Sequence, residues 1–466
     1  MRTFKSVVLF FFLGILSCSD QPETKEVIIN WEEGESFGIV GTPFWGDVQM
    51  REARLWCQLE DADLDSYRLT VWNDSIEPAT FKPILSGLAN CVHFLANGLQ
   101  PGTSYLATVD DGAYPVSDTL KFTTQTLWQY RTDPPALKLA LGSCTFINEP
   151  EFDRPGDGYG GDYHIFQTMA KEEPDATFWL GDNVYLREVD FSSIHGFVHR
   201  YEHTRSNKEL QELLAVGSHY AIWDDHDFGP NDCDGSWIHQ DWSRRVFDAF
   251  WANPESGIPN APELNVTTFE LADVQVFLLD NRTHRVNHEM GSAQRQILGP
   301  IQRKWLLNAL KNSRARFKLI AIGGQMVSDA AIFENFAQFP EERKLLLSEL
   351  NRLDIRGVIF LTGDRHNSEL SRVQLKNGNW VYDLTVSPLT SSSYDHTDEP
   401  NSLRVPGTMV GNRNYGIIEV SGPRKERVLA MTVKNADGEV HWSGRIDAAD
   451  DYSLSMDSVY QSSSNK

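Results

Sequence analysis

The amino-acid sequence predicts an α/β protein in which a small all-β sandwich domain precedes a larger layered β-sandwich flanked by helices. The chain has 466 residues, whereas one domain usually has about 100–200. Apolar and polar residues alternate in the first part, and short apolar runs alternate with helical segments after about residue 137. Alternation is typical of half-buried strands, and the second pattern is typical of a layered α/β domain.

Residues 1–17 are predicted to be an export signal. Arg2 and Lys5 precede an apolar run over residues 7–16 that is too short to span a bilayer. The run ends in Ile-Leu-Ser-Cys, which resembles the cleavage box of bacterial lipoproteins. In that interpretation Cys18 carries a lipid anchor, and the protein is exported as a periplasmic or cell-surface lipoprotein. The alternative is an ordinary secretory signal in which the cysteine is incidental.

The next region is predicted to be a tether followed by the β-sandwich. Residues 18–35 are acidic and polar, which is typical of a tether. Residues 36–125 contain alternating runs such as 53–59 and 67–72. Residues 99–105 read Leu-Gln-Pro-Gly-Thr-Ser-Tyr, which resembles the turn and strand of fibronectin type III domains, where the tyrosine packs at the sandwich edge. An ordinary Pro-Gly turn is the alternative, and both interpretations give a sandwich.

The second domain is predicted to begin after a linker. Residues 126–136 form this linker, residues 137–446 form the α/β domain, and the polar, serine-rich residues 447–466 are expected to be a flexible tail. The candidate strands are 137–141, 176–180, 219–223, 274–279, 317–322 and 357–361. The candidate helices are 341–353 and 301–312, the latter with Ile301, Trp305, Leu306 and Leu310 on one face.

Four cysteines follow Cys18 in the chain: Cys57, Cys91, Cys144 and Cys233. Export permits disulfides, so Cys57 and Cys91 are candidates for a bridge between two strands. Two buried, unpaired cysteines are the alternative.

Polar residues follow five of the predicted strands at the point where each ends. The clusters are Gly142-Ser143-Cys144, Gly181-Asp182-Asn183-Val184-Tyr185, Asp224-Asp225-His226-Asp227, Asp280-Asn281-Arg282 and Thr362-Gly363-Asp364-Arg365-His366. In layered α/β domains the loops beyond the carboxyl ends of strands lie together. One such cluster is commonly a cap or a turn, but five of them predict a shared site.

These motifs, in this order, resemble the PhoD-like branch of the metallophosphoesterases over about residues 139–416. The matching elements are Gly-Ser-Cys, Gly-Asp-x-x-Tyr, Trp-Asp-Asp-His-Asp, Asp-x-Arg-x-x-Arg, Gly-Pro-x-Gln-x-x-Trp-Leu and Leu-Thr-Gly-Asp-x-His. The resemblance implies the layered metallophosphoesterase sandwich, with an N-terminal β domain similar to that of purple acid phosphatases. It also implies metal-dependent hydrolysis of a small phosphate ester, either a monoester or a diester, with Fe³⁺ and Ca²⁺ as the metals.

The resemblance assigns metal-ligand roles to Cys144, Asp182, Tyr185, Asp225, Asp364 and His366. Asp182 is expected to bridge two metals, and Cys144 and Tyr185 to bind the ferric ion, with Asn231 as a weaker candidate ligand. Thiolate and phenolate suit a highly charged iron, whereas Ca²⁺ takes oxygen ligands. The alternatives are a small buried cysteine and an ordinary core tyrosine.

His226 and Arg282 are the candidate catalytic residues. His226 is expected to protonate the leaving alkoxide or to steady the phosphate, with Asp224 or Asp227 orienting its ring. The planar guanidinium of Arg282 suits non-bridging phosphate oxygens, and Arg285 is a second candidate; a salt bridge is the alternative for both.

The chain departs from the commoner family pattern around His226. Residues 224–233 read Asp-Asp-His-Asp-Phe-Gly-Pro-Asn-Asp-Cys, where many members have Asp-Asp-His-Glu-Val and paired asparagines. This departure leaves the substrate shape and the asparagine ligand open. Asp383 and Ser387 are candidates for groups that support the metal ligands.

Composition excludes a general binder of polyanions. The 42 basic and 65 acidic residues give a formal net charge of -23, which repels nucleic-acid phosphates and anionic membranes. We therefore expect no nucleic-acid binding beyond a possible substrate, and membrane association only through Cys18. A surface lipoprotein that binds glycan or protein, with a degenerate phosphatase domain, is the alternative function; the intact ligand set argues against it.

Overall fold

The computed structural model describes residues 9–11, 25–27, 38–60, 63–156 and 158–459. Of the predicted signal and tether it describes β1 (Leu9–Phe11) and β2 (Lys25–Val27), which pair antiparallel. The predicted anchor, Cys18, lies outside the described residues. Within the described ranges, none of the helices has both the length and the apolar character needed to cross a bilayer.

The N-terminal region is built around two facing sheets. Its strands are β3 (Ile39–Val48), β4 (Glu52–Leu59), β5 (Arg68–Asn73), β6 (Ile76–Phe81), β7 (Pro83–Ser86), β8 (Cys91–Asn97), β9 (Ser104–Asp110) and β10 (Leu120–Thr123). One sheet has the order β10-β9-β5-β6, and β3, β4, β8 and β7 belong to the other. The core between them includes Trp45, Leu55, Leu69, Phe94 and Val109.

Tyr105 fixes the turn that precedes β9. Its hydroxyl oxygen accepts the backbone N–H of Gln100 at 2.9 Å, and its ring stacks on Phe122 with a centroid distance of 5.3 Å. The buried tyrosine therefore ties the Pro-Gly turn to the strand that follows it. The expectation that this tyrosine packs on the sandwich is confirmed.

The C-terminal part is an α/β domain, as the sequence predicts. Its strands are β11 (Leu137–Gly142), β12 (Ala176–Leu180), β13 (Ser218–Ile222), β14 (Thr267–Leu271), β15 (Val274–Leu278), β16 (Phe317–Ala321), β17 (Val358–Thr362), β18 (Glu369–Gln374), β19 (Trp380–Thr385), β20 (Asn414–Ser421), β21 (Val428–Asn435), β22 (Val440–Asp447) and β23 (Ser453–Val459). Its helices are α1 (His164–Lys171), α2 (Ile194–Arg205), α3 (Lys208–Leu214), α4 (Asp225–Phe228), α5 (Gln240–Phe250), α6 (Gly299–Asn312) and α7 (Pro340–Arg352).

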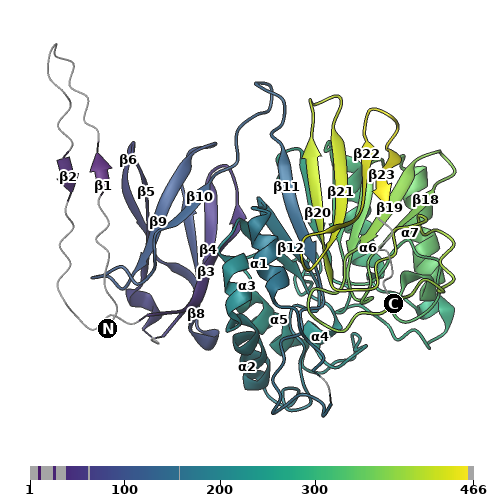
Figure 1. The fold of residues 1–466 in the computed structure, drawn as a ribbon, viewed down its shortest axis with the longest axis horizontal. Coiled ribbons are helices and arrows are strands. Elements are labelled where there is room, and N and C mark those ends of the chain that lie inside the picture. Colours follow the sequence, from purple (N-terminus) through teal and green to yellow (C-terminus); the bar gives the residue numbers. More distant parts are fainter. Residues whose placement is uncertain (1–8, 12–24, 28–37, 61–62, 157, 460–466) are drawn as a thin grey trace.

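Two sheets and their helices form the layers of this domain (Figure 1). An 11-stranded sheet has the order β23-β22-β21-β20-β11-β12-β13-β3-β4-β8-β7, and a 6-stranded sheet has the order β14-β15-β16-β17-β19-β18. An apolar core that includes Leu139, Phe178, Leu319 and Ile359 lies between them. Side chains of α1, α2, α3 and α5 pack in a second core, and those of α6 and α7 in a third. The strands β11, β12 and β13 run parallel, as do β15, β16, β17 and β19.

The two predicted domains share a sheet rather than lying only side by side. Strand β3 pairs in parallel with β13 through Trp45 and Ser218. The reason is that β4, next to β3, is buried on both faces. On one face Cys57 lies in the N-terminal core. On the other face Trp56 packs in the helical layer, and its indole N–H donates to the backbone oxygen of Ala249 at 2.8 Å. Alternation predicted only one buried face for this strand.

The predicted buried face of α6 needs correction. Ile301, placed on the buried face of α6, is 40% exposed. Gln302 is buried instead, because its side chain accepts the N–H of Asp280 at 2.9 Å and donates to the Asp280 carbonyl at 2.7 Å. A buried amide whose groups are all satisfied by backbone is invisible to an apolar pattern.

The predicted flexible tail is ordered over most of its length. Residues 453–459 form β23, which pairs antiparallel with β22. The preceding Tyr452 is buried edge-on against Phe317 at 5.8 Å, and its backbone oxygen accepts the hydroxyl of Tyr382 at 2.6 Å. These contacts hold the segment on the sheet despite its serine content. The rest of the tail, residues 460–466, lies outside the described residues.

Cys57 and Cys91 are both buried free thiols. The register pairs Cys57 with Val92, and Gln58 with Cys91. Since neighbouring residues of a strand point to opposite faces, the two thiols lie on opposite faces of the sheet, Cys57 in the N-terminal core and Cys91 in the helical layer. The candidate disulfide is therefore wrong, and the alternative of two unpaired cysteines is confirmed.

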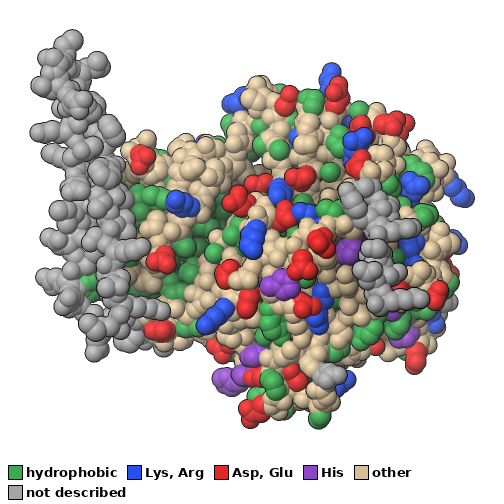
Figure 2. Space-filling model, viewed as in Figure 1, with side chains coloured by type: hydrophobic (Ala, Val, Ile, Leu, Met, Phe, Trp, Pro, Cys, Tyr) green, Lys and Arg blue, Asp and Glu red, His purple; other side chains and the backbone are tan. Residues whose placement is uncertain are grey.

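The basic side chains are dispersed on one face of the molecule. On the face drawn in Figure 2, lysine and arginine side chains are scattered singly among acidic ones. Proteins that bind nucleic acid through electrostatics instead gather basic side chains on one face. This face offers no such basic patch.

Candidate metal centre

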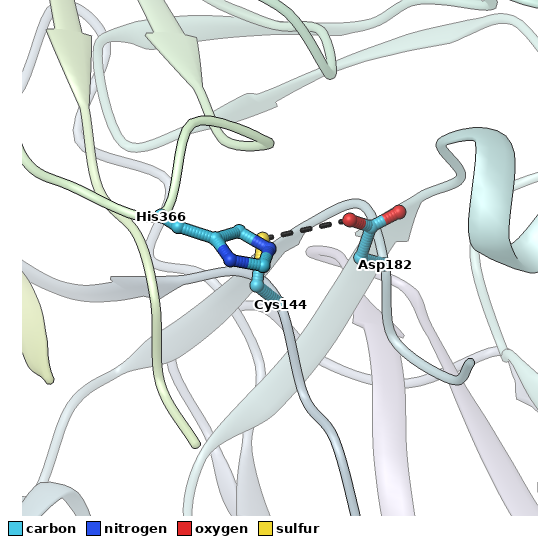
Figure 3. Close-up of side chains that lie close together, drawn as sticks. All are labelled: Cys144, Asp182 and His366. Atoms are coloured by element: carbon cyan, nitrogen blue, oxygen red, sulfur yellow. Dashed lines mark hydrogen bonds between the residues drawn. The ribbon is translucent and has the colours of Figure 1, made fainter. Parts of the chain in front are cut away.

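Three predicted ligands from different strand ends meet at one point. Cys144 follows β11, Asp182 follows β12 and His366 follows β17 (Figure 3). The Cys144 Sγ donates to Asp182 Oδ2 at 3.5 Å, and one potential ligand atom from each of the three residues lies within 4.8 Å of the others. A thiol, a carboxylate and an imidazole at this separation fit the coordination shell of a single metal ion.

Tyr185 belongs to the same group. Its hydroxyl donates to Asp182 Oδ2 at 3.2 Å and lies 3.1 Å from His366 Nε2. Burial, followed by the charges of Cys144 and Asp182, raises the pKa of Tyr185 well above its ordinary value. A bound cation would favour the phenolate form, so the position of Tyr185 is compatible with metal coordination.

A second group of ligand atoms lies on the other side of Asp182. Potential ligand atoms of Asp182, Asp225 and His226 also lie within 4.8 Å of one another. The backbone N–H of His226 donates to Asp182 Oδ1 at 3.3 Å, whereas Oδ2 faces Cys144 and Tyr185. The two oxygens of one carboxylate thus face two different ligand groups, which is the geometry that a bridging ligand needs.

The backbone at these ligands is strained. Cys144, Asp182, Asp364 and His366 have φ values of 60°, 51°, 67° and 55°. Residues with a β-carbon rarely adopt positive φ, and such strain clusters at functional sites. The backbone next to Asp182 is also tightly packed. Gly181 has φ of 91°, and a Cβ placed there would lie 2.6 Å from the Cβ of Asp224. The predicted ligands therefore occupy positions that carry a conformational cost.

The charges of the site favour a bound cation. Burial first, and then neighbouring carboxylates, raise the pKa of Asp182 and of Asp364 well above the ordinary range. Asp225 Oδ1 is buried and has no hydrogen-bond partner among the described residues, and its ion-pair partner Arg282 lies 3.6 Å away. Burial also lowers the pKa of His366 to about 4, which keeps its imidazole neutral and able to coordinate. The donor set therefore fits metal binding, since cations would relieve the repulsion between the carboxylates and could coordinate the oxygen that lacks a hydrogen bond.

Arg282 is not open to a substrate. Its side chain is fully buried, and it pairs with Asp224 and, at 2.5 Å, with Glu334. Its Nη1 donates to the Cys233 carbonyl at 3.1 Å. The expectation that its planar fork meets phosphate oxygens is wrong for this arrangement, because buried carboxylates and a backbone carbonyl already occupy the guanidinium.

Arg285 also pairs with a buried carboxylate. The two aspartates expected to orient His226 bind other groups. Arg285 pairs with Glu334 at 2.6 Å, which confirms the salt-bridge alternative. Asp224 accepts from Arg282 Nε at 2.6 Å, and Asp227 accepts the backbone N–H groups of Asp224 and Asn183. The prediction that Asp224 or Asp227 orients the imidazole of His226 is therefore wrong; its ring instead packs on Tyr185 with a centroid distance of 4.2 Å.

The candidate supporting residues have separate roles. The Ser387 hydroxyl donates to Cys144 Sγ at 3.1 Å and accepts the N–H of His366 at 2.9 Å, so it supports two ligands at once. Asp383 accepts the N–H groups of Met326 and Val327, each at 2.7 Å, and shapes a neighbouring loop. Asn231 is exposed on the loop after α4.

Glu334 is the functional residue that sequence reasoning missed. It lies on the loop between β16 and α7, is 4% exposed, and has a ligand atom within 4.8 Å of those of Asp224 and Asp225. Arg282 already lies among these three carboxylates, 3.6 Å from Asp225 at Oδ1. No local signal in Phe-Glu-Asn-Phe marks this glutamate, because its role depends on two arginines from another loop.

Glu334→Ala is expected to lower the free energy of unfolding by about 3–5 kcal/mol, the usual cost of removing one partner of a buried ion pair. Arg285 would lose its carboxylate, and Arg282 would keep Asp224 and the more distant Asp225, 3.6 Å away. Urea denaturation would measure the change, with Glu255→Ala, at an exposed position, as the matched control. Equal stability of the two variants would contradict the buried network.

A family model, one curated relative and one solved structure match this chain. The family model of the PhoD-like phosphatase matches residues 139–421. Alkaline phosphatase D of Bacillus subtilis (strain 168) is 24% identical over 335 residues, a match that covers 62% of this chain and 55% of that protein. A solved structure described as the structure of PhoD is 18% identical, covers 93% of this chain and 94% of its own, and has a TM-score of 0.74. This structural likeness extends over both halves of the fold.

Proposed function

The chain belongs to the PhoD-like phosphatase family, and on that premise we propose that it hydrolyses phosphate esters with a metal-activated water. The match to the Bacillus phosphatase covers only about half of that protein, 55% of its length. The proposal therefore stands on the centre itself. The observation that carries it is Asp182, whose two oxygens face two ligand groups of different chemistry.

The two sides of Asp182 favour two kinds of metal. On one side Cys144, Tyr185 and His366 offer sulfur, phenolate and imidazole, which suit Fe³⁺, and on the other Asp225 offers the oxygens that Ca²⁺ prefers. Asp364 belongs to neither group of ligand atoms that lie within 4.8 Å of one another among the described residues, and we keep it as a proposed ligand only because the family motif includes it. When bound, such metals lower the pKa of water and neutralise charge on phosphate oxygens. The intact set argues against a degenerate binding domain.

His226 is proposed as the residue that meets the substrate. Its side chain is partly exposed, and packing on Tyr185 at 4.2 Å fixes the ring at the edge of the cluster. From there it protonates the leaving oxygen or steadies the phosphate. Arg282, beneath the cluster, offsets the charge of Asp224 and Glu334 and so positions the carboxylates rather than contacting the ester.

His226→Ala is expected to lower kcat by about 100- to 10,000-fold, the usual share of general acid–base catalysis, with the metal content retained. Because His226 also lies within ligand distance of Asp182 and Asp225, elemental analysis must accompany the kinetics. Loss of one equivalent of metal would contradict the catalytic assignment and make His226 a ligand. His195→Ala, at an exposed histidine in the first turn of α2, is the control.

Hydrolysis of mono- and bis-p-nitrophenyl phosphate by the purified protein tests the function. We expect turnover of at least one of them, its loss after prolonged dialysis against chelator, and its recovery when Fe³⁺ and Ca²⁺ are returned. The ratio of the two rates distinguishes a monoesterase from a diesterase. A metal-replete protein that turns over neither ester would contradict the proposal.

The fold and the location of the protein complete the proposal. We assign the two facing sheets of the α/β domain to the layered metallophosphoesterase sandwich, and the region before residue 126 to an accessory β domain that braces it. Cys18 is the proposed lipid anchor of an exported periplasmic or cell-surface protein, where phosphate esters outside the cytoplasm would be its substrates. Membrane association that persists in Cys18→Ala would contradict the anchor.

A further inference from the structure

A rim of aromatic rings extends outward from the metal centre. Next to His366, the Tyr394 ring lies parallel within 5° at a centroid distance of 5.7 Å. His396 follows at 6.0 Å from Tyr394, and Phe333 at 6.1 Å from His396. Tyr159 lies on another side of His366, at 6.0 Å. We refer to Tyr159, Tyr394, His396 and Phe333 as the aromatic rim. Three loops far apart in sequence supply it.

The outer rings of this rim are exposed to solvent but held in place. Phe333 is 63% exposed and Tyr394 is 48% exposed, although large apolar side chains are usually buried. The guanidinium of Arg365 lies 4.5 Å from the Phe333 ring centroid, and Glu399 pairs with that guanidinium. The backbone N–H of Tyr394 donates to the His366 carbonyl at 3.0 Å, which couples this ring to a metal-ligand candidate. Fixed, exposed rings beside a reactive centre form a stacking surface.

The charges around the aromatic rim restrict what can stack there. Asp395 and Asp398 are exposed on the same loop as Tyr394. Among the described residues, Arg365 alone places its guanidinium over the Phe333 ring, and Glu399 neutralises that charge. The whole chain carries a formal charge of -23. A second phosphate at this point would be repelled, whereas a neutral ring would not. Carboxylates can also accept hydrogen bonds from the amino groups of a nucleobase.

We propose that the aromatic rim is a subsite for a nucleobase carried by the ester, so that nucleoside monophosphates or their simple diesters are the preferred substrates. The inference rests on the proposed function, because it names the organic group of the ester cleaved at Asp182. Stacking of a base on one aromatic side chain changes affinity by about 10-fold or more. Tyr394 and Phe333 are therefore specificity-determining residues, not catalytic ones.

The test compares adenosine 5′-phosphate with ribose 5-phosphate, since both release a primary alkoxide at C5 of ribose and differ in carrying a base or a hydroxyl at C1. The full-length, metal-replete protein is assayed for phosphate release, and the methyl diesters of the two compounds are run in parallel. We expect kcat/KM for the adenosine compound to exceed that for the ribose compound by about 10-fold or more. Tyr394→Leu and Phe333→Leu should each reduce this ratio, and the double variant should bring it to about 1, whereas Tyr394→Phe should preserve it.

Two further measurements separate this inference from the proposed function. Tyr130→Leu, at a tyrosine that is 91% exposed within the predicted linker, is the control and should leave the ratio unchanged. Calorimetric titration with adenosine itself needs no turnover, and it should show binding that the double variant loses. A ratio near 1 in the unmodified protein, or a ratio that the Leu variants leave unchanged, overturns the subsite while the hydrolase stands. Adenosine binding that depends on the rim, without any hydrolysis, supports the subsite and overturns the function.

Discussion

Asp182→Asn is expected to lower kcat/KM for phosphate esters by about 1,000-fold or more. Metal stabilisation of the transition-state charge is worth several kcal/mol, and each 1.4 kcal/mol corresponds to about tenfold in rate. Asn keeps the shape of the side chain but replaces one anionic oxygen by an amide, so it cannot bridge two cations. Because Oδ2 faces Cys144 and Tyr185 while Oδ1 faces the His226 amide, both ligand groups lose a shared anion.

The kinetics should be read together with metal content and folding. Asp118→Asn makes the same chemical change at an exposed carboxylate of the N-terminal region, and we expect wild-type rates from it. Circular dichroism and urea denaturation would show that Asp182→Asn is folded; relief of carboxylate repulsion is expected to keep it stable, since burial and its neighbours raise the pKa of Asp182. An Asn variant that retains most of its turnover would refute the assigned centre.

Cys144→Ser is expected to lower the affinity of the site for iron by at least about 100-fold, because even residues that only support metal ligands change affinity by about 10- to 100-fold. Cys144 is fully buried, its Sγ accepts from Ser387 at 3.1 Å, and it donates to Asp182 at 3.5 Å. A serine hydroxyl fits the space but is a far weaker donor to a ferric ion than thiolate. Elemental analysis after dialysis would measure the loss of iron.

A matched cysteine separates metal binding from packing. Cys57→Ser replaces the same atom at another fully buried cysteine, in the core of the N-terminal region and on other strands than the centre. It should lower stability by burying a hydroxyl among apolar neighbours but leave iron content and turnover unchanged. Equal iron content in the Cys144 and Cys57 variants would show that the thiol at position 144 is structural.

Much of the centre follows from local sequence signals. Cys144, Asp182 and His366 lie in the loops that follow β11, β12 and β17. β11 and β12 belong to the 11-stranded sheet and β17 to the 6-stranded sheet, so the loops meet because the carboxyl ends of these strands from two packed sheets lie at the same end of the domain. The prediction that these side chains converge is therefore confirmed by their geometry. Tyr185 joins them because Gly-Asp-x-x-Tyr places it three residues after Asp182, within one loop.

The fates of two charged side chains depended on packing. Arg282 follows a strand end just as the ligands do, yet it is fully buried between Asp224 and Glu334. Whether this guanidinium pairs with a carboxylate or stays open to a substrate depends on which loop covers it. The loop that covers it comes from a distant part of the chain. Glu334 could not be found for the same reason, since its partners are defined only after the sheets have packed.

The sequence by itself determined the α/β class, the positions of six strands of the α/β domain and the residues that follow them, because periodicity and strand-end chemistry are local properties of the chain. Only the tertiary structure decided that the N-terminal strands continue the 11-stranded sheet through Trp45 and Ser218, and that residues 453–459 add another strand to it. It also decided that the side chain of Arg282 is fully buried. These features depend on which surfaces bury one another. Which side chains are buried depends on contacts between segments that are distant in sequence, so it cannot be predicted from any one segment alone.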